Sequence, residues 1–287
     1  MTVSSVQIWR HRVTQDTAWG AVPVRAAAAM TPTQGEGVPR PVTAWDELTT
    51  RPAATPHFLS LGDELIDGAL GGGIGPGVTE IWGEEGSGKS HLGLLLALQV
   101  QLPLELGGLD GTAVYISTEG SIPVTRLKSL SEGIIERHPW MRIWSFLDNI
   151  SVYNVQTFEE QQRILFSELP MRLSEDRSVR LVVIDSISGL LRTELHLHEL
   201  ARVHGVRIIA INQVADVVSG ADSGGAILHR VKPALGLTWT VGLSARIAVT
   251  RDQRGRRQLH VLKSPCAPDA SIDFTILDTC ITASNNS

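Results

Sequence analysis

Apolar residues along this chain form short continuous runs, separated by longer segments in which they recur at helical spacing. The runs RLVVID at 180–185 and VRIIAIN at 206–212 are typical of parallel strands covered on both faces. Shorter apolar runs predict further strands, one ending at Trp82 and the others at 112–117 and 150–155. The intervening segments predict helices at 90–102, 126–134 and 157–173. Thr157 is the expected N-cap of the last of these helices.

After residue 236 the pattern changes from alternating strands and helices to consecutive strands. We expect these strands at 237–242, 245–251, 257–264 and 271–277, with a turn at DQRG between two of them. Strand–helix–strand crossovers followed by such an extension predict an α/β fold with three layers. Its sheet is mostly parallel, with antiparallel C-terminal strands.

Before this domain the chain has little periodicity. Residues 20–42 are rich in Ala, Pro, Gly and Thr, which favours a linker or disordered arm. We expect a disordered or atypical arm at 1–40, a linker at 41–56 and the folded domain at 57–287. The basic residues of the arm form no amphipathic face, which favours a disordered tail over a mitochondrial transit peptide.

Composition narrows the classes of partner. Of the 287 residues 43% are hydrophobic, which is ample for a core, and the net charge is -5, so any contact with nucleic acid must come from a local basic patch. No apolar run approaches 18 residues, so we expect no membrane partner. The two cysteines have no zinc-type spacing and indicate a reducing compartment.

The segment WGEEGSGKSH at 82–91 matches the phosphate-binding motif G-x-x-x-x-G-K-[ST]. It lies between a predicted strand and a predicted helix, the context in which such a loop cradles phosphates. Lys89 is expected to reach the β- and γ-phosphates, and Ser90 to bind Mg²⁺. The expected nucleotide-binding residues of the loop are Gly83, Glu84, Glu85, Gly86, Ser87, Gly88, Lys89 and Ser90.

Three polar residues lie at or just after the ends of other predicted strands, where the carboxyl ends of parallel strands meet. Asp185 is expected to support Mg²⁺, although an N-cap for the next helix is the alternative. Glu119 is placed to orient an attacking water, and Gln213 to hydrogen-bond the γ-phosphate. The alternative for Glu119 is a glutamate on the surface without a role in catalysis. The alternative for Gln213 is an ordinary turn residue.

The segments GEEGSGKSH, AVYISTEG, LVVIDSISGLLRTE, INQV and LKSPCAP, in this order, resemble the RecA-type recombinases. PALGLTW, ARIAVTR and SIDFTI are similar to the paralogue subgroup that assists the eukaryotic strand-exchange recombinase in homologous-recombination repair. The resemblance covers about Ala44 to Ile281. It implies a RecA-like ATPase domain at 57–287 that binds ATP and Mg²⁺, in a nuclear protein.

Roles for individual residues follow from the resemblance. Lys89, Glu119 and Gln213 would be catalytic, and Arg126 would stack on adenine. Gln213 would open a DNA-contacting loop that ends in Arg230 and Lys232. Contacts between subunits would involve Ala44, Ser264 and Pro265. The implied partners are single-stranded DNA, another recombinase paralogue and the strand-exchange recombinase, in a hetero-oligomer.

The sequence departs from the family in two places. Between Glu194 and Leu195 it lacks the stretch with the first DNA-binding loop, which indicates a weakened grip on DNA or a variant transcript. The 20 residues between Asp185 and Val206 still suffice for a minimal crossover helix, so the sheet can survive. Pro41 replaces the phenylalanine anchor of the linker, which favours assembly with other paralogues over self-polymerisation.

Two functions from different classes are favoured. One is a DNA-dependent ATPase that loads or stabilises the recombinase on single-stranded DNA. The other is a scaffold in which ATP joins subunits without being hydrolysed. An unrelated P-loop enzyme, such as a small-molecule kinase, is the third alternative. The absence of a lid-like arginine-rich segment argues against that enzyme. The basic segment RDQRGRRQ at 251–258 fits a DNA contact and a solvated turn equally well.

Overall fold

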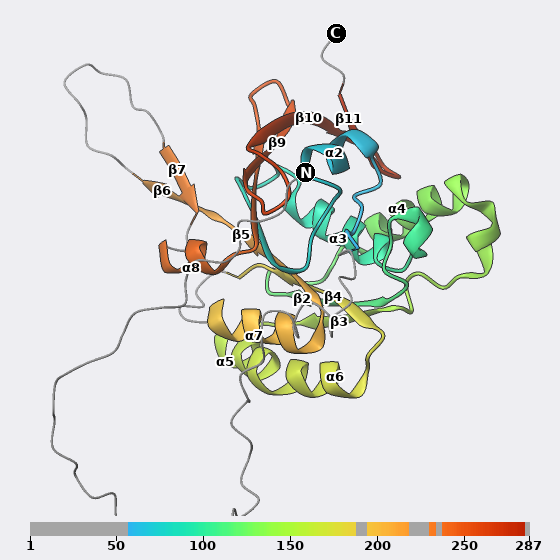
Figure 1. The fold of residues 1–287 in the computed structure, drawn as a ribbon, viewed down its shortest axis with the longest axis vertical. Helices are drawn as coiled ribbons and strands as arrows, with labels where there is room; N and C mark the ends of the chain where they lie inside the picture. Colours follow the sequence, from blue (N-terminus) through green and yellow to red (C-terminus); the bar gives the residue numbers. More distant parts are fainter. Residues whose placement is uncertain (1–56, 188–193, 218–229, 234–236, 285–287) are drawn as a thin grey trace, which may run out of the picture. The chain divides into compact units, whose positions relative to one another are not determined.

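The computed structural model describes residues 57–187, 194–217, 230–233 and 237–284 (Figure 1). The predicted arm, most of the predicted linker, and with them Pro41 and Ala44, lie outside the described residues. The domain boundaries therefore stay predictions.

Nine of the described strands form one sheet, in the order β11-β10-β9-β8-β1-β5-β4-β2-β3 (Figure 1). The strands from β8 to β3 in this order pair in parallel, and β9, β10 and β11 extend the sheet antiparallel. The predicted fold class is confirmed. The strands are β1 (Gly77–Trp82), β2 (Thr112–Ser117), β3 (Ile150–Asn154), β4 (Val179–Asp185), β5 (Arg207–Asn212), β8 (Ala245–Arg251), β9 (Arg257–Lys263), β10 (Ala270–Ile276) and β11 (Ile281–Ala283).

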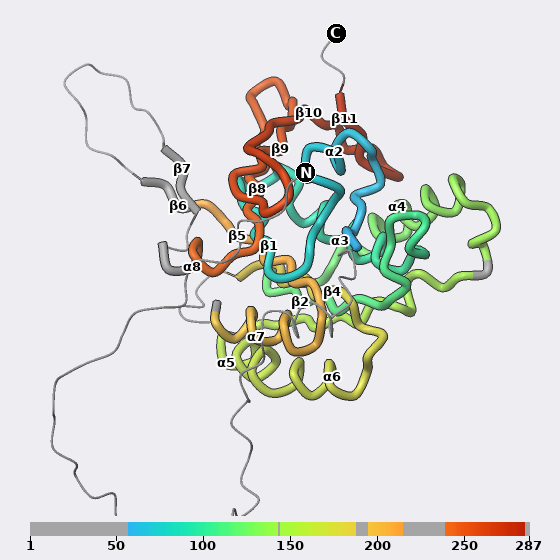
Figure 2. Tube along the Cα trace, in the orientation of Figure 1, coloured from blue at the N-terminus to red at the C-terminus, as the bar shows by residue number. Residues whose placement is uncertain are grey.

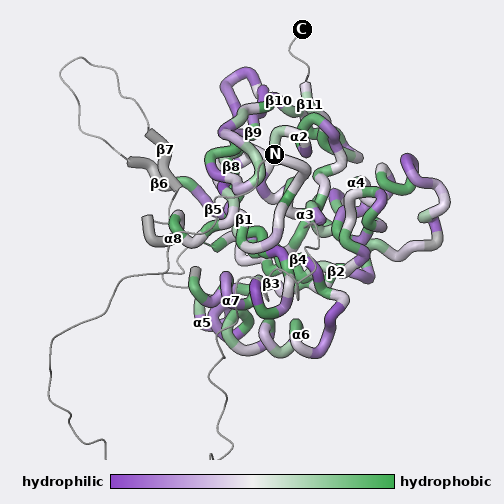
Figure 3. Tube along the Cα trace, viewed as in Figure 1, coloured by the Kyte–Doolittle hydropathy of each residue, from purple (hydrophilic) through white to green (hydrophobic). Residues whose placement is uncertain are grey.

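Alternate residues of the central strands enter two separate cores. In β4, Leu181 and Val183 pack with the apolar side of the helices α3 and α4, while Val182 and Ile184 pack with α6, α7 and the turn that precedes α6. This alternation makes the continuous apolar runs necessary, because both faces of the sheet are covered. Figure 3 shows hydrophobic residues along the central strands. The helices are α2 (Glu64–Ala69), α3 (Lys89–Gln99), α4 (Val124–Arg137), α5 (Phe158–Arg163), α6 (Leu169–Glu175), α7 (Glu194–His204) and α8 (Leu237–Gly242).

The predicted helix at 157–173 is present as a helical run with an irregular centre. Thr157 caps α5 in a capping box with Glu160. A π-helical turn at Ile164–Glu168 then joins α5 to α6.

The strand predicted at 237–242 is wrong, because the structure forms the short helix α8 there. The alternation of Leu, Thr, Trp and Val in this segment suggested a strand with one buried face. Instead, Trp239 and Leu243 are buried four residues apart on one side, in the same core as α7. Tertiary packing has overridden the local pattern.

The shortened crossover leaves the sheet intact, as expected. Strand β5 pairs in parallel with β4, and α7 lies between them in sequence. Its buried residues Leu197, Leu200 and Ala201 have helical spacing and face the sheet core.

Two further features complete the domain. The start of the domain packs against its end: α2 contacts β10 and β11, and Ala283 N donates to Asp63 Oδ2 at 3.0 Å (Figure 2). After β5, strands β6 (Val214–Val217) and β7 (Arg230–Pro233) form an antiparallel two-stranded hairpin. Among the described residues, no helix combines the length and apolar character needed to cross a bilayer.

Candidate nucleotide-binding site

The phosphate-binding motif forms the loop between β1 and α3. Gly88 has φ 118°, and a Cβ there would lie 2.7 Å from Ile276 Cδ1, so only glycine fits this position. Gly88 is also the N-cap of α3 and offers no side-chain oxygen to the first-turn N–H groups. These N–H groups and the helix dipole are therefore available to an anion.

The loop opens into a cavity of about 480 Å³. The structure brings the loop together there with Glu119, Asp185 and Gln213, from the ends of three different strands. Their roles in chemistry stay predictions. The lining residues are Gly83, Glu85, Gly86, Gly88, Lys89, Ser90, His91, Glu119, Asp185, Gln213 and Val214.

Lys89 is nearly buried at the start of α3. Its Nζ donates to the carbonyl oxygen of Glu84 at 2.8 Å, which bends the ammonium back over the loop. Burial lowers the pKa of Lys89, and the charges of Asp185 and Glu119 oppose this shift. The ammonium therefore lies among carboxylates and can also bind a phosphate in the cavity.

Asp185 ends β4 and accepts two side-chain hydrogen bonds. The Tyr115 hydroxyl donates to its Oδ2 at 2.6 Å, and the Ser90 hydroxyl donates to the same carboxyl group. Burial raises the pKa of Asp185 above the usual range for aspartate, and the two hydrogen bonds oppose the shift. The hydroxyl of Ser90 and the carboxylate of Asp185 are hard oxygen ligands, so this pair fits Mg²⁺.

Glu119 and Gln213 meet at the mouth of the cavity. Gln213 Nε2 donates to Glu119 Oε1 at 2.5 Å, and both side chains are exposed. The turn that carries Glu119 is held by Ser117 Oγ, which donates to Gly120 O at 2.7 Å. A carboxylate held by an amide beside a phosphate loop is placed to orient a water molecule.

Arg126 projects from α4 and does not line this cavity. It pairs with Asp278, at 3.2 Å between Nη1 and Oδ1. Burial lowers the pKa of His91 to about 4, and the charges of Arg126 and Arg257 add to this shift. The expected contact of Arg126 with adenine stays a prediction.

Tyr115, His91 and Arg257 also belong to the site, although they lie outside the residues that the motif predicts. Arg257 Nε donates to the carbonyl oxygen of Ser87, at 3.1 Å, and so holds the loop from behind. It lies in the basic segment at 251–258, so this segment contacts the phosphate loop in addition to the predicted alternatives of a DNA contact and a solvated turn. Another arginine of this segment, Arg256, forms an ion pair with Asp252. His91 directly follows Ser90 in the motif segment, whereas Tyr115 and Arg257 reach the site only through the pairing of strands far apart in the chain.

The remaining predicted residues lie elsewhere. Ser264 and Pro265 follow β9 and line a small cavity with Phe58, away from the phosphate loop. Arg230 and Lys232 lie in β7, but only their backbone is described. In the described part of the chain, no three side chains of His, Cys, Asp or Glu are grouped so that they could hold a metal ion.

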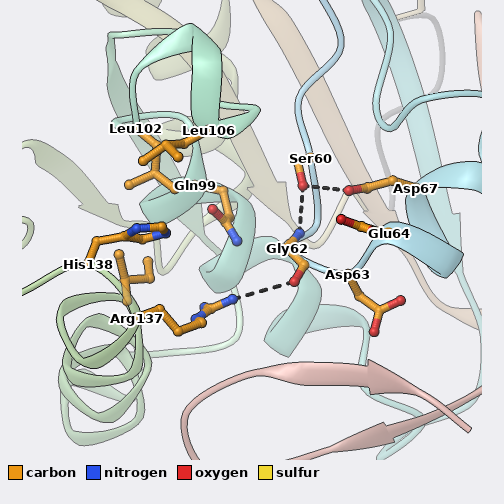
Figure 4. A pocket seen from close by; sticks show the side chains of 11 residues that line it. Ser60, Gly62, Asp63, Glu64, Asp67, Gln99, Leu102, Leu106, Arg137 and His138 are labelled. Atoms are coloured by element: carbon orange, nitrogen blue, oxygen red, sulfur yellow. Dashed lines mark hydrogen bonds between the residues drawn. The ribbon is translucent and has the colours of Figure 1, made fainter.

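A second pocket of about 190 Å³ lies between α2 and the ends of α3 and α4 (Figure 4). Ser60 Oγ donates to Asp67 Oδ2 at 2.5 Å on one wall, and Arg137 Nη1 donates to Gly62 O at 3.4 Å on the other. Burial raises the pKa of Asp67. This pocket shares no lining residue with the nucleotide cavity.

The fold and the loop together define a P-loop NTPase with a RecA-like core. Comparison with known proteins narrows this class. The family described as Rad51 matches residues 57–196. The chain is 30% identical over 249 residues to the DNA repair and recombination protein RadA of Metallosphaera sedula, covering 78% of this chain and 71% of that protein.

Two eukaryotic relatives are similar over a comparable length. The DNA repair protein XRCC3 of Mus musculus is 32% identical over 261 residues, covering 76% of this chain and 73% of that protein. The DNA repair protein rhp57 of Schizosaccharomyces pombe is 29% identical over 279 residues, covering 77% and 78%. The chain belongs to the Rad51 family. The proteins of this family bind nucleotide together with Mg²⁺.

The comparisons also bear on the missing stretch. The Rad51 match ends at residue 196, beside the point at which the sequence departs from the family. The alignment with XRCC3 is 261 positions long, but it covers only 76% of the 287 residues of this chain. The alignment is therefore longer than the part of this chain that it contains. That relative therefore has residues with no counterpart in this chain.

Proposed function

We propose that this protein is an ATP-dependent mediator of homologous recombination and double-strand break repair. It acts in the nucleus on single-stranded DNA, together with another recombinase paralogue and the strand-exchange recombinase. Its relatives support the repair role, since their names describe proteins of DNA repair and recombination. The residues around the phosphate loop support the use of ATP.

The contact between Gln213 and Glu119 carries the proposal. Glu119 is the residue best placed to orient water, and Gln213 immediately precedes the β6–β7 hairpin. A γ-phosphate in the cavity competes with Glu119 for the Gln213 amide. Binding and loss of this phosphate can therefore change the position of Gln213, and with it the start of the hairpin.

The residues would divide the chemistry as follows. Lys89 and the loop N–H groups hold the phosphates, and Ser90 with Asp185 holds Mg²⁺. When bound, this ion would neutralise charge that develops on the phosphate oxygens. Glu119 accepts a proton from the attacking water, and Gln213 orients the terminal phosphate.

The test is DNA-stimulated phosphate release by the purified protein with its paralogue partner. Glu119→Gln is expected to lower the rate about 100-fold or more, since it removes the general base. Lys89→Ala is expected to abolish it. Glu105→Gln, at an exposed glutamate outside the site, is the matched control. Equal rates for wild type and Lys89→Ala would exclude the ATPase.

A scaffold that binds ATP without hydrolysing it is the second candidate. The short crossover through α7 favours it, because the stretch that carries the first DNA loop in the family is missing. A scaffold predicts that Glu119→Gln supports repair in cells as well as wild type, while Lys89→Ala loses its partner. Failure of Glu119→Gln in cells would exclude the scaffold.

A further inference from the structure

Glu80 is a fully buried carboxylate in the strand that leads into the phosphate loop, with 0% exposure. Its Oε2 accepts from Arg246 Nε at 2.6 Å. Its Oε1 accepts twice, from Asn212 Nδ2 at 2.7 Å and from Trp239 Nε1 at 2.9 Å. A buried charge is tolerated only when it is paired and hydrogen-bonded, and these three donors meet that requirement.

The partners of Glu80 occupy particular places in the chain. Asn212 is the last residue of β5, directly before Gln213 and strand β6. Trp239 lies in α8, which follows β7. One carboxylate therefore holds the chain on both sides of the β6–β7 hairpin, three residues before Gly83 of the phosphate loop.

The same network contains two polar groups with nothing to bind. Asn212 Oδ1 and Trp82 Nε1 are buried and find no hydrogen-bond partner among the described residues. Trp82 and Asn212 are opposed in the register of β1 and β5, and the Arg246 guanidinium lies 5.7 Å from the centre of the Trp82 ring. One group is a donor and the other an acceptor. Buried groups left unpaired in this way store free energy that another arrangement recovers.

We propose that Glu80 is a positioning residue that couples the nucleotide to both ends of the β6–β7 hairpin. A γ-phosphate that draws Gln213 away from Glu119 displaces the neighbouring Asn212. Because Asn212 and Trp239 both donate to the Glu80 carboxylate, Trp239 moves when Asn212 moves. The two ends of the hairpin, at β6 and β7, are then displaced together. The inference rests on the proposed binding of ATP and goes beyond it, since it assigns a role to residues that touch no nucleotide.

The test is amide hydrogen exchange of the full-length protein with and without a slowly cleaved ATP analogue and Mg²⁺. In the wild type the analogue is expected to slow exchange about tenfold in both β6 and β7. Trp239→Phe keeps an aromatic ring in the core and removes the indole N–H together with part of the ring volume. It is expected to keep the protection of β6 and to lose that of β7, and Glu80→Gln to lose both.

The matched control is Trp140→Phe, at a tryptophan that is 56% exposed and belongs to a different part of the domain. It is expected to behave as the wild type. Nucleotide binding is measured separately for each variant by titration. If Trp239→Phe binds the analogue and still protects β7 fully, the coupling through Glu80 is wrong while the proposed function stands. A wild type that binds no analogue overturns both.

Discussion

In the nucleotide site, the cost of burying a charged side chain depends on the hydrogen bonds that its neighbours donate or accept. Asp185 is the main example, because burial disfavours its charged form and the Tyr115 hydroxyl offsets this cost. Burial and the neighbouring Asp185 charge raise the pKa of Tyr115 well above its usual value, so this hydroxyl stays protonated and remains a donor. The tyrosine thereby prepares the carboxylate for a metal ion.

Tyr115→Phe is expected to lower the free energy of unfolding by about 1–3 kcal/mol at neutral pH, since it leaves a buried carboxylate oxygen without its donor. Urea unfolding in the absence of Mg²⁺ measures this change. Tyr153→Phe is the matched control, because the Tyr153 side chain is partly exposed and its hydroxyl has no hydrogen bond with any described residue. Equal stabilities for the two variants would contradict the role of Tyr115.

Among the helices and strands, the helical run from α5 to α6 combines a well-defined start with an irregular centre. The capping box satisfies the first N–H groups of α5, with Glu160 N donating to Thr157 Oγ1 at 3.2 Å. Leu165 and Leu169 then anchor the run in the core beneath the sheet. The cap matters here because α5 itself has only six residues.

Thr157→Ala is expected to destabilise the domain by about 1 kcal/mol through loss of this cap. Thr157→Ser keeps the hydroxyl and is expected to lie within about 0.5 kcal/mol of wild type. Chemical denaturation of both variants measures the difference. An alanine variant as stable as the serine variant would show that the capping bond contributes nothing in solution.

The whole domain should gain stability from its nucleotide, because the phosphate loop exists only in the folded state. At a free concentration of 100 times Kd, ATP with Mg²⁺ is expected to add about 2.7 kcal/mol. For a domain of this size the gain corresponds to a rise in Tm of roughly 5–10 °C.

Differential scanning fluorimetry with and without ATP and Mg²⁺ measures the rise. Lys89→Ala at the same ATP concentration is expected to show little or no shift, since it loses the charge that faces the phosphates. An equal rise in both proteins would indicate that ATP binds outside the phosphate loop.

Much of the fold could be predicted from the sequence, because its signals are local. The apolar runs at 180–185 and 206–212 became β4 and β5, since a strand covered on both faces must be apolar throughout. The phosphate loop was found because its glycines are required by the backbone conformation itself. Asp185, Glu119 and Gln213 came together because the carboxyl ends of parallel strands share one edge of the sheet.

Other features depend on contacts between residues far apart in the chain, and only the tertiary structure decided them. The segment 237–242 became a helix that buries Trp239 and Leu243 on one side, with Trp239 bonded to Glu80 of β1. Arg257 braces the phosphate loop because β9 is placed near it by the order of the sheet. Periodicity and motifs report the backbone and burial of one segment, whereas the partner of a buried polar group is set by the register between segments.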